Sequence, residues 1–181
     1  FIRKAAGMGK ASRLPDPDNY EHAHDFCDIL IVGAGPAGIA AAKEAANKKL
    51  DVILVEQDSL LGGDQLGENN FNTNQIYDEL KSLGIRIMQR TTAFGLYDNC
   101  VLGLLERVTD HVPYGNIDLP RQRFWTIRAK HVIIGAGSLE RHIAYNNNDI
   151  PGVMTVNASK HYLNRYGILT GQNIVITTNN D

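Results

Sequence analysis

The sequence predicts an α/β protein built on a Rossmann-like, dinucleotide-binding sheet, and three observations support this. An apolar run at residues 28–33 stops at a glycine-rich turn, an alanine-rich helical stretch follows at residues 36–48, and a second apolar run occupies residues 51–56. Near-continuous apolar runs are typical of parallel strands that are covered on both faces. Strand, helix and strand within about 30 residues form a βαβ unit, whose crossover is right-handed in nearly all proteins.

The elements after this unit alternate in the same way. The segment TNQIYDELKSLG has apolar residues at helical spacing and ends in a glycine, so it predicts a helix, and residues 85–89 predict a third parallel strand. Three short extended stretches, TTAFGLYD, VLGLLERV and QRFWTIRA, are separated by turn-rich loops and predict an antiparallel β-meander inserted in the domain. The stretch HVIIGAG, residues 131–137, returns to the pattern of a buried strand.

The C-terminal part predicts the start of a truncated second dinucleotide-type domain. We expect a helix at residues 156–166 and a strand at residues 173–177. The turn-forming run NNNDIPG follows HVIIGAG and predicts a domain connection. The chain starts with Phe and stops just after an apolar stretch, so we expect both ends to be cut. We divide it into an N-terminal extension and linker (1–24), a dinucleotide-binding domain (25–148) and the beginning of a second Rossmann-like domain (149–181).

Composition and charge narrow the class of protein. The 181 residues, 43% of them hydrophobic, are enough for one domain with a real core. A formal net charge of -2 gives no basic field, so we expect neither nucleic acid nor a membrane as a partner. No stretch reaches the roughly 18 apolar residues of a membrane helix. Cys27 and Cys100 are too few for a disulfide scaffold, which favours reduced thiols in a cytoplasmic protein.

The turn GAGPAG, residues 33–38, carries the chemistry. Gly33 permits a tight turn, Gly35 leaves room for a pyrophosphate, and Gly38 lets the helix pack close to the strand. The helix N-terminus adds free N–H groups and the positive end of its dipole. Glu56 ends the next strand, where a carboxylate accepts hydrogen bonds from both hydroxyls of an adenosine ribose and repels a 2′-phosphate. The motif therefore predicts NAD or FAD, whose AMP halves are the same.

Two further glycine turns favour a flavoprotein-type architecture over a simple dehydrogenase. Gly62 and Gly63 follow Glu56 closely, as in folds where a second glycine pair passes near the pyrophosphate. After the meander, HVIIGAG runs into a turn of small residues, Ala136 and Gly137, which can also approach the dinucleotide.

In this order the pieces resemble the glutathione-reductase-like flavoprotein superfamily and, within it, the family of α subunits of heterotetrameric sarcosine oxidases. The resemblance covers nearly the whole chain. It rests on the segments FIRKAAGMGKA, DPDNYEHAH, CDILIVGAGPAGIAAA, RQRFWTIRAKHVIIGAGSLER, NNNDIPGVM, YLNRYG and TTNND. Several of these segments are not required by a generic Rossmann fold.

The resemblance implies an oxidoreductase that acts on CH–NH donors, demethylating sarcosine to glycine, hydrogen peroxide and a one-carbon unit that can pass to tetrahydrofolate. It also implies partner subunits β, γ and δ, with FAD in β and FMN between α and β. This domain would carry NAD, with FAD as the alternative. The folate-binding half of such a subunit is not in the sequence, so we expect this chain alone to bind a nucleotide without oxidising sarcosine.

Carried over position by position, the resemblance adds an adenine contact at Thr92 and Ala93. We assign no catalytic residue and no metal ligand. The residues assigned to the dinucleotide are Gly33, Gly35, Pro36, Ala37, Gly38, Glu56, Gln57, Gly62, Gly63, Thr92, Ala93, Ala136 and Gly137.

Two departures from the superfamily limit the chemistry. The loop GGDQLGENN lacks the redox cysteine pair of disulfide reductases, which excludes dithiol chemistry. The segment NIVIT runs into TNND without a second glycine motif, so we do not expect a normal second NAD(P)H site. Two alternatives stay open: an FAD-binding subunit of an amine or opine dehydrogenase, and a module whose dinucleotide is purely structural.

Three other patterns have simpler interpretations. Tyr77 and Lys81 match the YxxxK pair of short-chain dehydrogenases but come too early in the chain, so we expect a solvated helix face. His22 and His24 have HxH spacing without an evident third ligand, which favours a linker over a metal site. The run RQRFW, residues 121–125, resembles a stacking surface for nucleic acid, but the acidic total favours a charged strand face or a contact with a partner.

Overall fold

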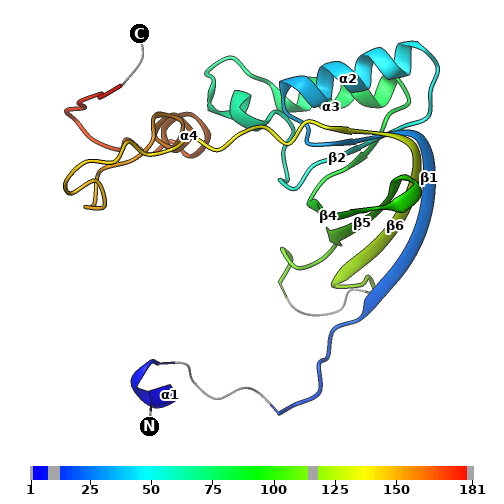
Figure 1. The fold of residues 1–181 in the computed structure, drawn as a ribbon, viewed down its shortest axis with the longest axis horizontal. Helices are drawn as coiled ribbons and strands as arrows, with labels where there is room; N and C mark the ends of the chain where they lie inside the picture. The colour runs from blue at the N-terminus through cyan, green and yellow to red at the C-terminus, as the bar shows by residue number, and fades with distance from the viewer. Residues whose placement is uncertain (1, 8–12, 114–117, 179–181) are drawn as a thin grey trace.

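The structure is a computed structural model, and it describes residues 2–7, 13–113 and 118–178. The strands of this part form one mixed sheet in the order β3-β2-β1-β6-β5-β4 (Figure 1). Strands β3, β2, β1 and β6 are parallel, and β6, β5 and β4 are antiparallel. The strands are β1 (Tyr20–Val32), β2 (Val52–Val55), β3 (Arg86–Met88), β4 (Thr91–Tyr97), β5 (Val101–Arg107) and β6 (Gln122–Ile134).

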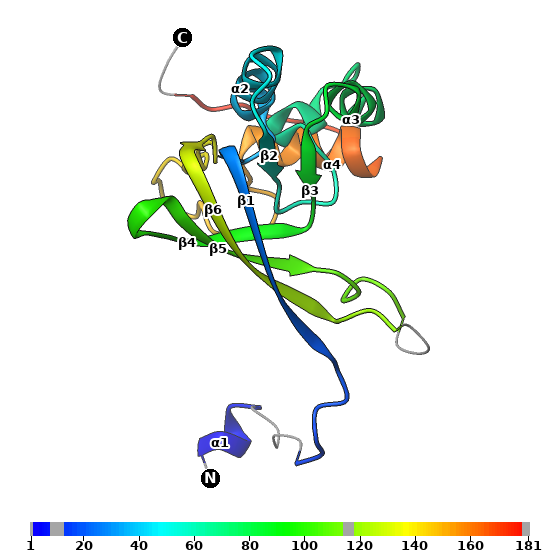
Figure 2. The ribbon, with the colours of Figure 1, turned by 90° about the vertical axis from the view of Figure 1, so that its right-hand side faces the viewer.

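The helices lie on one face of the sheet or beyond its edges. Helices α2 and α3 cover the parallel part of the sheet, whereas α1 lies well away from it (Figures 1 and 2). Helix α2 begins at Pro36 and α4 spans Val156–Tyr166, as the sequence predicts. A left-handed Gly167 caps the C-terminus of α4. The helices are α1 (Ile2–Ala5), α2 (Pro36–Asn47), α3 (Thr73–Ser82) and α4 (Val156–Tyr166), with short 3-10 helices η1 (Gly63–Gly67) and η2 (Asp98–Cys100).

Strands β1 and β6 are the longest elements, with 13 residues each, and they pair along almost their whole length (Figure 2). The second half of β1 also pairs with β2, and the first half of β6 also pairs with β5. The pair is therefore shared by the dinucleotide-type sheet and the meander.

Two expectations about these strands are wrong. Strand β1 begins at Tyr20 rather than at residue 28, so part of the expected linker is strand. HVII is not a separate strand, because β6 runs without a break from Gln122 to Ile134. The early part of β1 alternates between exposed and less exposed residues, a pattern of a strand with one solvated face, and it lacks the continuous apolar run that marks the second half.

Two apolar cores lie on the two faces of the sheet. One packs α2 and α3 against the sheet and contains Ile31 and Leu80. The other lies on the opposite face, where the sheet curls so that the meander covers the central strands, and contains Leu30 and Leu104. Neighbouring residues of a strand point to opposite faces, so Leu30 and Ile31 enter different cores, and both are fully buried. This explains the uninterrupted apolar run in β1.

The meander and helix α4 are confirmed, but the last expected strand is wrong. Residues 173–177 form no strand, and Ile174, Val175 and Ile176 are all exposed. A strand needs neighbouring backbone to accept and donate its hydrogen bonds, and the described residues place none beside this segment. The run NNNDIPG does form turns, whereas the proposed domain boundaries stay a prediction. Within the described residues, none of the helices has the length and apolar character needed to cross a membrane.

Candidate dinucleotide-binding site

In the turn between β1 and α2, two of the glycines have no room for a side chain. A Cβ on Gly38 would lie 1.8 Å from the carbonyl oxygen of Gly33. Gly33 has a φ of +97°, and its Cβ would lie 2.4 Å from the carbonyl oxygen of Gly135. Strand β1, helix α2 and the end of β6 therefore meet at three glycines that approach one another at backbone contact distance.

Gly35 is different, because it faces open space. A Cβ at this position would have no atom within 4 Å outside its chain neighbours. Gly35 is also the N-cap residue of α2, followed by Pro36 at the first helical position. The first-turn N–H groups of a helix lack partners within the helix, and the helix dipole places partial positive charge there. The open space at Gly35 therefore suits a pyrophosphate.

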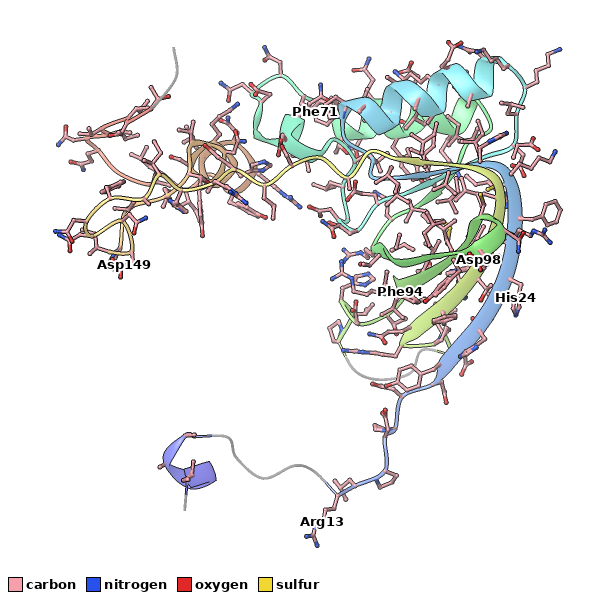
Figure 3. The ribbon with its side chains drawn as sticks, viewed as in Figure 1. Arg13, His24, Phe71, Phe94, Asp98 and Asp149 are labelled. Carbon is pink, nitrogen blue, oxygen red and sulfur yellow. The ribbon has the colours of Figure 1, made fainter. Side chains whose placement is uncertain are left out.

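The second glycine pair lies directly beside this turn. The Gly62 N–H donates to the carbonyl oxygen of Ala34 at 2.8 Å. A Cβ on Gly63 would lie 3.1 Å from the Cα of Gly35. On its other side Gly62 packs against Phe71, which lies over the same loop in Figure 3. The two glycine pairs, 27 positions apart in the sequence, thus form one continuous backbone surface.

Glu56 is a buried carboxylate fixed by two backbone donors. Its Oε2 accepts from the N–H of Ala34 at 2.8 Å, and its Oε1 accepts from the N–H of Asp58 at 2.9 Å. The side chain is only 8% exposed. An ionised carboxylate has about four acceptor positions, so two remain for ligand hydroxyls. Glu56 therefore lies beside the start of the glycine turn and retains the capacity to bind both hydroxyls of a ribose.

The residues expected to contact the adenine lie in β4, and the first residue of this strand is hydrogen-bonded to Glu56. The N–H of Thr91 donates to the backbone carbonyl of Glu56 at 2.8 Å, and Thr92 and Ala93 come next in β4. Thr92 is exposed, whereas Ala93 packs partly on the core beneath. Gln57, which follows Glu56 in the sequence, is exposed and accepts a hydrogen bond at its carbonyl oxygen from Arg107.

The turn after β6 reaches the glycine turn through a residue that our sequence reading missed. Gly135 donates its N–H to Val32 at 2.8 Å and is the residue that contacts Gly33. Ala136 and Gly137 follow it and are exposed. The repeat of the tripeptide GAG at residues 33–35 and 135–137 is the signal that could have identified Gly135.

An ion pair beyond the predicted residues connects α4 to this site. Arg165 donates from Nη1 and Nη2 to the two carboxylate oxygens of Asp58, at 2.7 and 2.8 Å. This hydrogen bonding lowers the pKa of Asp58 to about 2. In addition, Asn164 donates to the Gly67 carbonyl, and Lys160 pairs with Glu68. Nothing in the sequence marks two residues 107 positions apart as partners.

The two expected linker histidines are on strand β1, which corrects their assignment. His22 stacks on the ring of Phe124 in β6, with centroids 5.2 Å apart. His24 is exposed and points away from the concave side of the sheet (Figure 3). Across the described ranges, no group of three His, Cys, Asp or Glu side chains could hold a metal ion.

The basic run before and in β6 is a charged strand face. Arg123 donates to Glu21 at 2.7 Å and to Glu106 at 3.0 Å, and its guanidinium lies over the Trp125 ring. The Trp125 indole N–H donates to the same Glu106 at 2.7 Å. Arg121 Nε also lies 3.8 Å from Asp18 Oδ2. Both cations of the run are therefore paired within the chain, which agrees with the charged-face interpretation.

The last sequence pattern to place is YxxxK. Tyr77 and Lys81 lie on α3, and the Lys81 ammonium is 6.0 Å from the centre of the Tyr77 ring. Lys81 is exposed, as expected for a solvated helix face, whereas Tyr77 is partly buried against the core beneath α3, which corrects the expectation for that residue.

With this geometry the family can be assigned. The family model described as "Pyridine nucleotide-disulphide oxidoreductase" matches residues 27–174, which include all three glycine turns, Glu56 and helix α4. The chain belongs to this family. Membership indicates an oxidoreductase domain that binds FAD or NAD(P). The cysteine pair that disulphide chemistry would need is missing from the sequence, since the two cysteines are Cys27 and Cys100.

Curated relatives confirm the resemblance to α subunits. Over 99% of this chain and 19% of the relative, the chain is 43% identical to "Sarcosine oxidase subunit alpha" of Rhizobium meliloti (strain 1021). Over 97% of this chain and 19% of the relative, it is 37% identical to the protein of the same name from Corynebacterium sp. (strain P-1). The chain therefore spans about a fifth of the length of these members of its family.

A solved structure confirms the fold. L-proline dehydrogenase from P. horikoshii matches with a TM-score of 0.66 and 26% identity, over 84% of this chain and 31% of that chain. The Rossmann-like α/β architecture of the family thus holds for most of this chain.

Proposed function

We propose that this chain is the dinucleotide-binding part of the α subunit of a sarcosine oxidase, and that it binds NAD. The observation that carries the proposal is 43% identity to such a subunit along 99% of the chain, far beyond the glycine turn that all related folds need. The geometry supports the binding part of the proposal, because the open space at Gly35, the N-terminus of α2 and the fixed carboxylate of Glu56 lie next to one another.

The residues fit an adenine dinucleotide at two points, the pyrophosphate and the adenosine ribose. The pyrophosphate lies at Gly35 and the start of α2, where no side chain fills the space. The adenosine ribose binds the free acceptor positions of Glu56. The binding surface comprises Gly33, Gly35, Pro36, Ala37, Gly38, Glu56, Gln57, Gly62, Gly63, Thr92, Ala93, Ala136 and Gly137.

Glu56 excludes a phosphate on the ribose. Its carboxylate is held in place by two backbone N–H groups, so it cannot turn away from a 2′-phosphate without leaving those donors unpaired. The site therefore takes NAD in preference to NADP. The choice of NAD over FAD rests on the resemblance, since the two share their AMP half.

The whole protein is proposed to oxidise sarcosine to glycine, hydrogen peroxide and a one-carbon unit, in a cytoplasmic complex with β, γ and δ subunits that carries FAD and FMN elsewhere. NAD supplies hydride chemistry where it takes part in a reaction. The residues of this chain bind and orient the dinucleotide, and none is assigned a catalytic role.

A second candidate is an FAD-binding subunit of an amine dehydrogenase. The structural match to an L-proline dehydrogenase, with a TM-score of 0.66, favours this alternative. In that case the same turn binds the pyrophosphate of a working flavin.

The identity of the bound dinucleotide tests these candidates. The full-length protein is purified in its complex and denatured, and the released dinucleotide is identified by mass spectrometry. The Gly35→Val variant fills the open space at the pyrophosphate, and Ala40→Val, on an exposed position of the same helix, is the matched control.

We expect NAD in the wild type and the control, and its loss in Gly35→Val. Loss of FAD instead supports the dehydrogenase candidate. A wild-type protein without any dinucleotide contradicts both.

A further inference from the structure

Helix α4 is attached to the loop that follows Glu56, and the attachment is polar. Lys160, Asn164 and Arg165 lie on neighbouring turns of α4 and contact Glu68, Gly67 and Asp58, respectively. Figure 1 shows α4 beyond η1, on the side of the domain away from β1. These contacts fix the loop against a helix that comes from the far C-terminal part of the chain.

Of these contacts, the Arg165–Asp58 pair is the one that leads to the carboxylate. It is bidentate, and the Arg165 side chain is only 19% exposed. The backbone N–H of Asp58 donates to Oε1 of Glu56 at 2.9 Å. A bidentate guanidinium fixes both the position and the orientation of its carboxylate. Arg165 therefore holds one of the two backbone donors that hold Glu56.

The backbone of the turn around Asp58 is also held by three distant donors, since the carbonyls of Gln57, Asp58 and Ser59 accept from Arg107, Arg90 and Gln89. The side chain of Asp58 has fewer restraints. The Asp58 side chain accepts from the N–H and hydroxyl of the next residue, Ser59, and the Asp58 carbonyl accepts from Arg90. Apart from Arg165, the side-chain partners of Asp58 are thus local to its own turn. Among the residues that the structure describes, Arg165 is the long-range partner of this carboxylate.

We propose that Arg165 is a positioning residue for the adenosine ribose: by clamping Asp58, it keeps Glu56 oriented for the two ribose hydroxyls. This inference rests on the proposed dinucleotide function. It implies that dinucleotide binding and docking of α4 on the loop stabilise each other, because coupling between two sites is reciprocal.

The first test is the dissociation constant for NAD of the dinucleotide-free, full-length protein. We expect Arg165→Ala to weaken NAD binding about tenfold, and Arg165→Lys to weaken it less, because an ammonium keeps the charge but not the bidentate geometry. Lys160→Ala is the matched control, since it removes an ion pair between the same helix and loop that does not contact Asp58. It should leave the constant within about twofold.

The second test separates positioning from general stability. An NAD analogue without the 2′-hydroxyl of the adenosine ribose is compared with NAD. In the wild type, removing this hydroxyl should weaken binding about tenfold, whereas in Arg165→Ala it should weaken binding only about twofold, because Glu56 no longer holds its geometry. A variant that loses affinity for NAD and the analogue in the same ratio as the wild type overturns the proposal.

If Arg165→Ala does not fold, both tests are made with Arg165→Lys and Asp58→Asn. Wild-type affinity for NAD in these variants, or an effect of Lys160→Ala as large as theirs, also overturns the proposal. A wild type that binds no NAD contradicts the proposed function itself, so the two failures are distinct.

Discussion

Gly38 and Gly33 touch so closely that a Cβ on Gly38 would lie 1.8 Å from the Gly33 carbonyl oxygen. That oxygen belongs to the backbone of the turn, so neither side can yield without moving helix α2 away from β1. The close approach sets the position of the helix N-terminus beside the open space at Gly35. Packing and ligand binding thus depend on the same pair of residues.

Gly38→Ala should therefore destabilise the fold strongly, by at least about 3 kcal/mol, since backbone must shift to admit one methyl group. Thermal unfolding of the full-length protein measures the effect. Gly171→Ala is the control, because its Cβ would make only an ordinary contact, 3.4 Å from the Asn173 carbonyl. Equal melting temperatures for the two variants would contradict the observed packing.

Glu56→Gln should weaken NAD binding about tenfold to a hundredfold and narrow the preference for NAD over NADP. The amide has a single acceptor oxygen for the N–H groups of Ala34 and Asp58, and it no longer repels a 2′-phosphate. Titration with both dinucleotides measures the two constants. Glu44→Gln, an exposed position of α2, makes the same chemical change without effect on either constant. An unchanged preference in Glu56→Gln would rule out this carboxylate as its source.

The Asp58–Arg165 pair predicts a pH dependence of stability. Hydrogen bonding from Arg165 lowers the pKa of Asp58 from 3.8 to about 2 in the folded protein. Since the folded pKa lies below the unfolded one, the pair stabilises the fold fully above about pH 4, and this contribution is lost as the pH falls toward 2. With Asp58 a third exposed, solvent screening reduces the contribution to about 1 kcal/mol.

Urea unfolding at several pH values tests this dependence. The wild type should exceed Asp58→Asn in its free energy of unfolding by about 1 kcal/mol at pH 6. The difference should shrink as the pH is lowered below 4. A difference that stays constant down to pH 2.5 would show that the lost interaction is not the ion pair.

Cys27 should resist alkylation in the native protein. The thiol is buried, and burial raises its pKa to about 11, so its reactive thiolate is scarce at pH 8. Cys100 is partly exposed and should react first. Mass spectrometry after brief iodoacetamide treatment locates the label, with urea-unfolded protein as the reference. Faster labelling of Cys27 than of Cys100 without urea would contradict the packing around β1.

The sequence was most informative where local pattern and packing agree. The apolar run ending at Gly33 and the acid at Glu56 predicted a βαβ unit, because the residue types of this unit depend on the local structure that they form. The same patterns predicted α4 with its observed bounds, Val156–Tyr166. The family resemblance was also readable, since its segments extend over nearly the whole chain.

The predictions that were wrong or absent have a common physical cause. They concern residues whose structure depends on a partner that is distant in the sequence. Tyr20 to Cys27 form a strand because β6 lies beside them, and nothing in their own composition requires it. Ile174 to Ile176 have the composition of a strand, but no described neighbour pairs with them. The ion pair between Arg165 and Asp58 likewise forms only when α4 packs on the loop, so no local sequence pattern could predict it.

The long pairing of β1 with β6 also bears on how the chain folds during synthesis. Tyr20 pairs with Gln122 and Val32 with Ile134, so each of these residues of β1 pairs with a residue that is made 102 positions later. Until then, β1 exposes an unpaired edge and two apolar surfaces, and contacts of such large sequence separation form slowly. The glycine turn receives Gly135 at the end of this process. A nascent chain of this protein therefore becomes able to bind its dinucleotide only after β6 has left the ribosome.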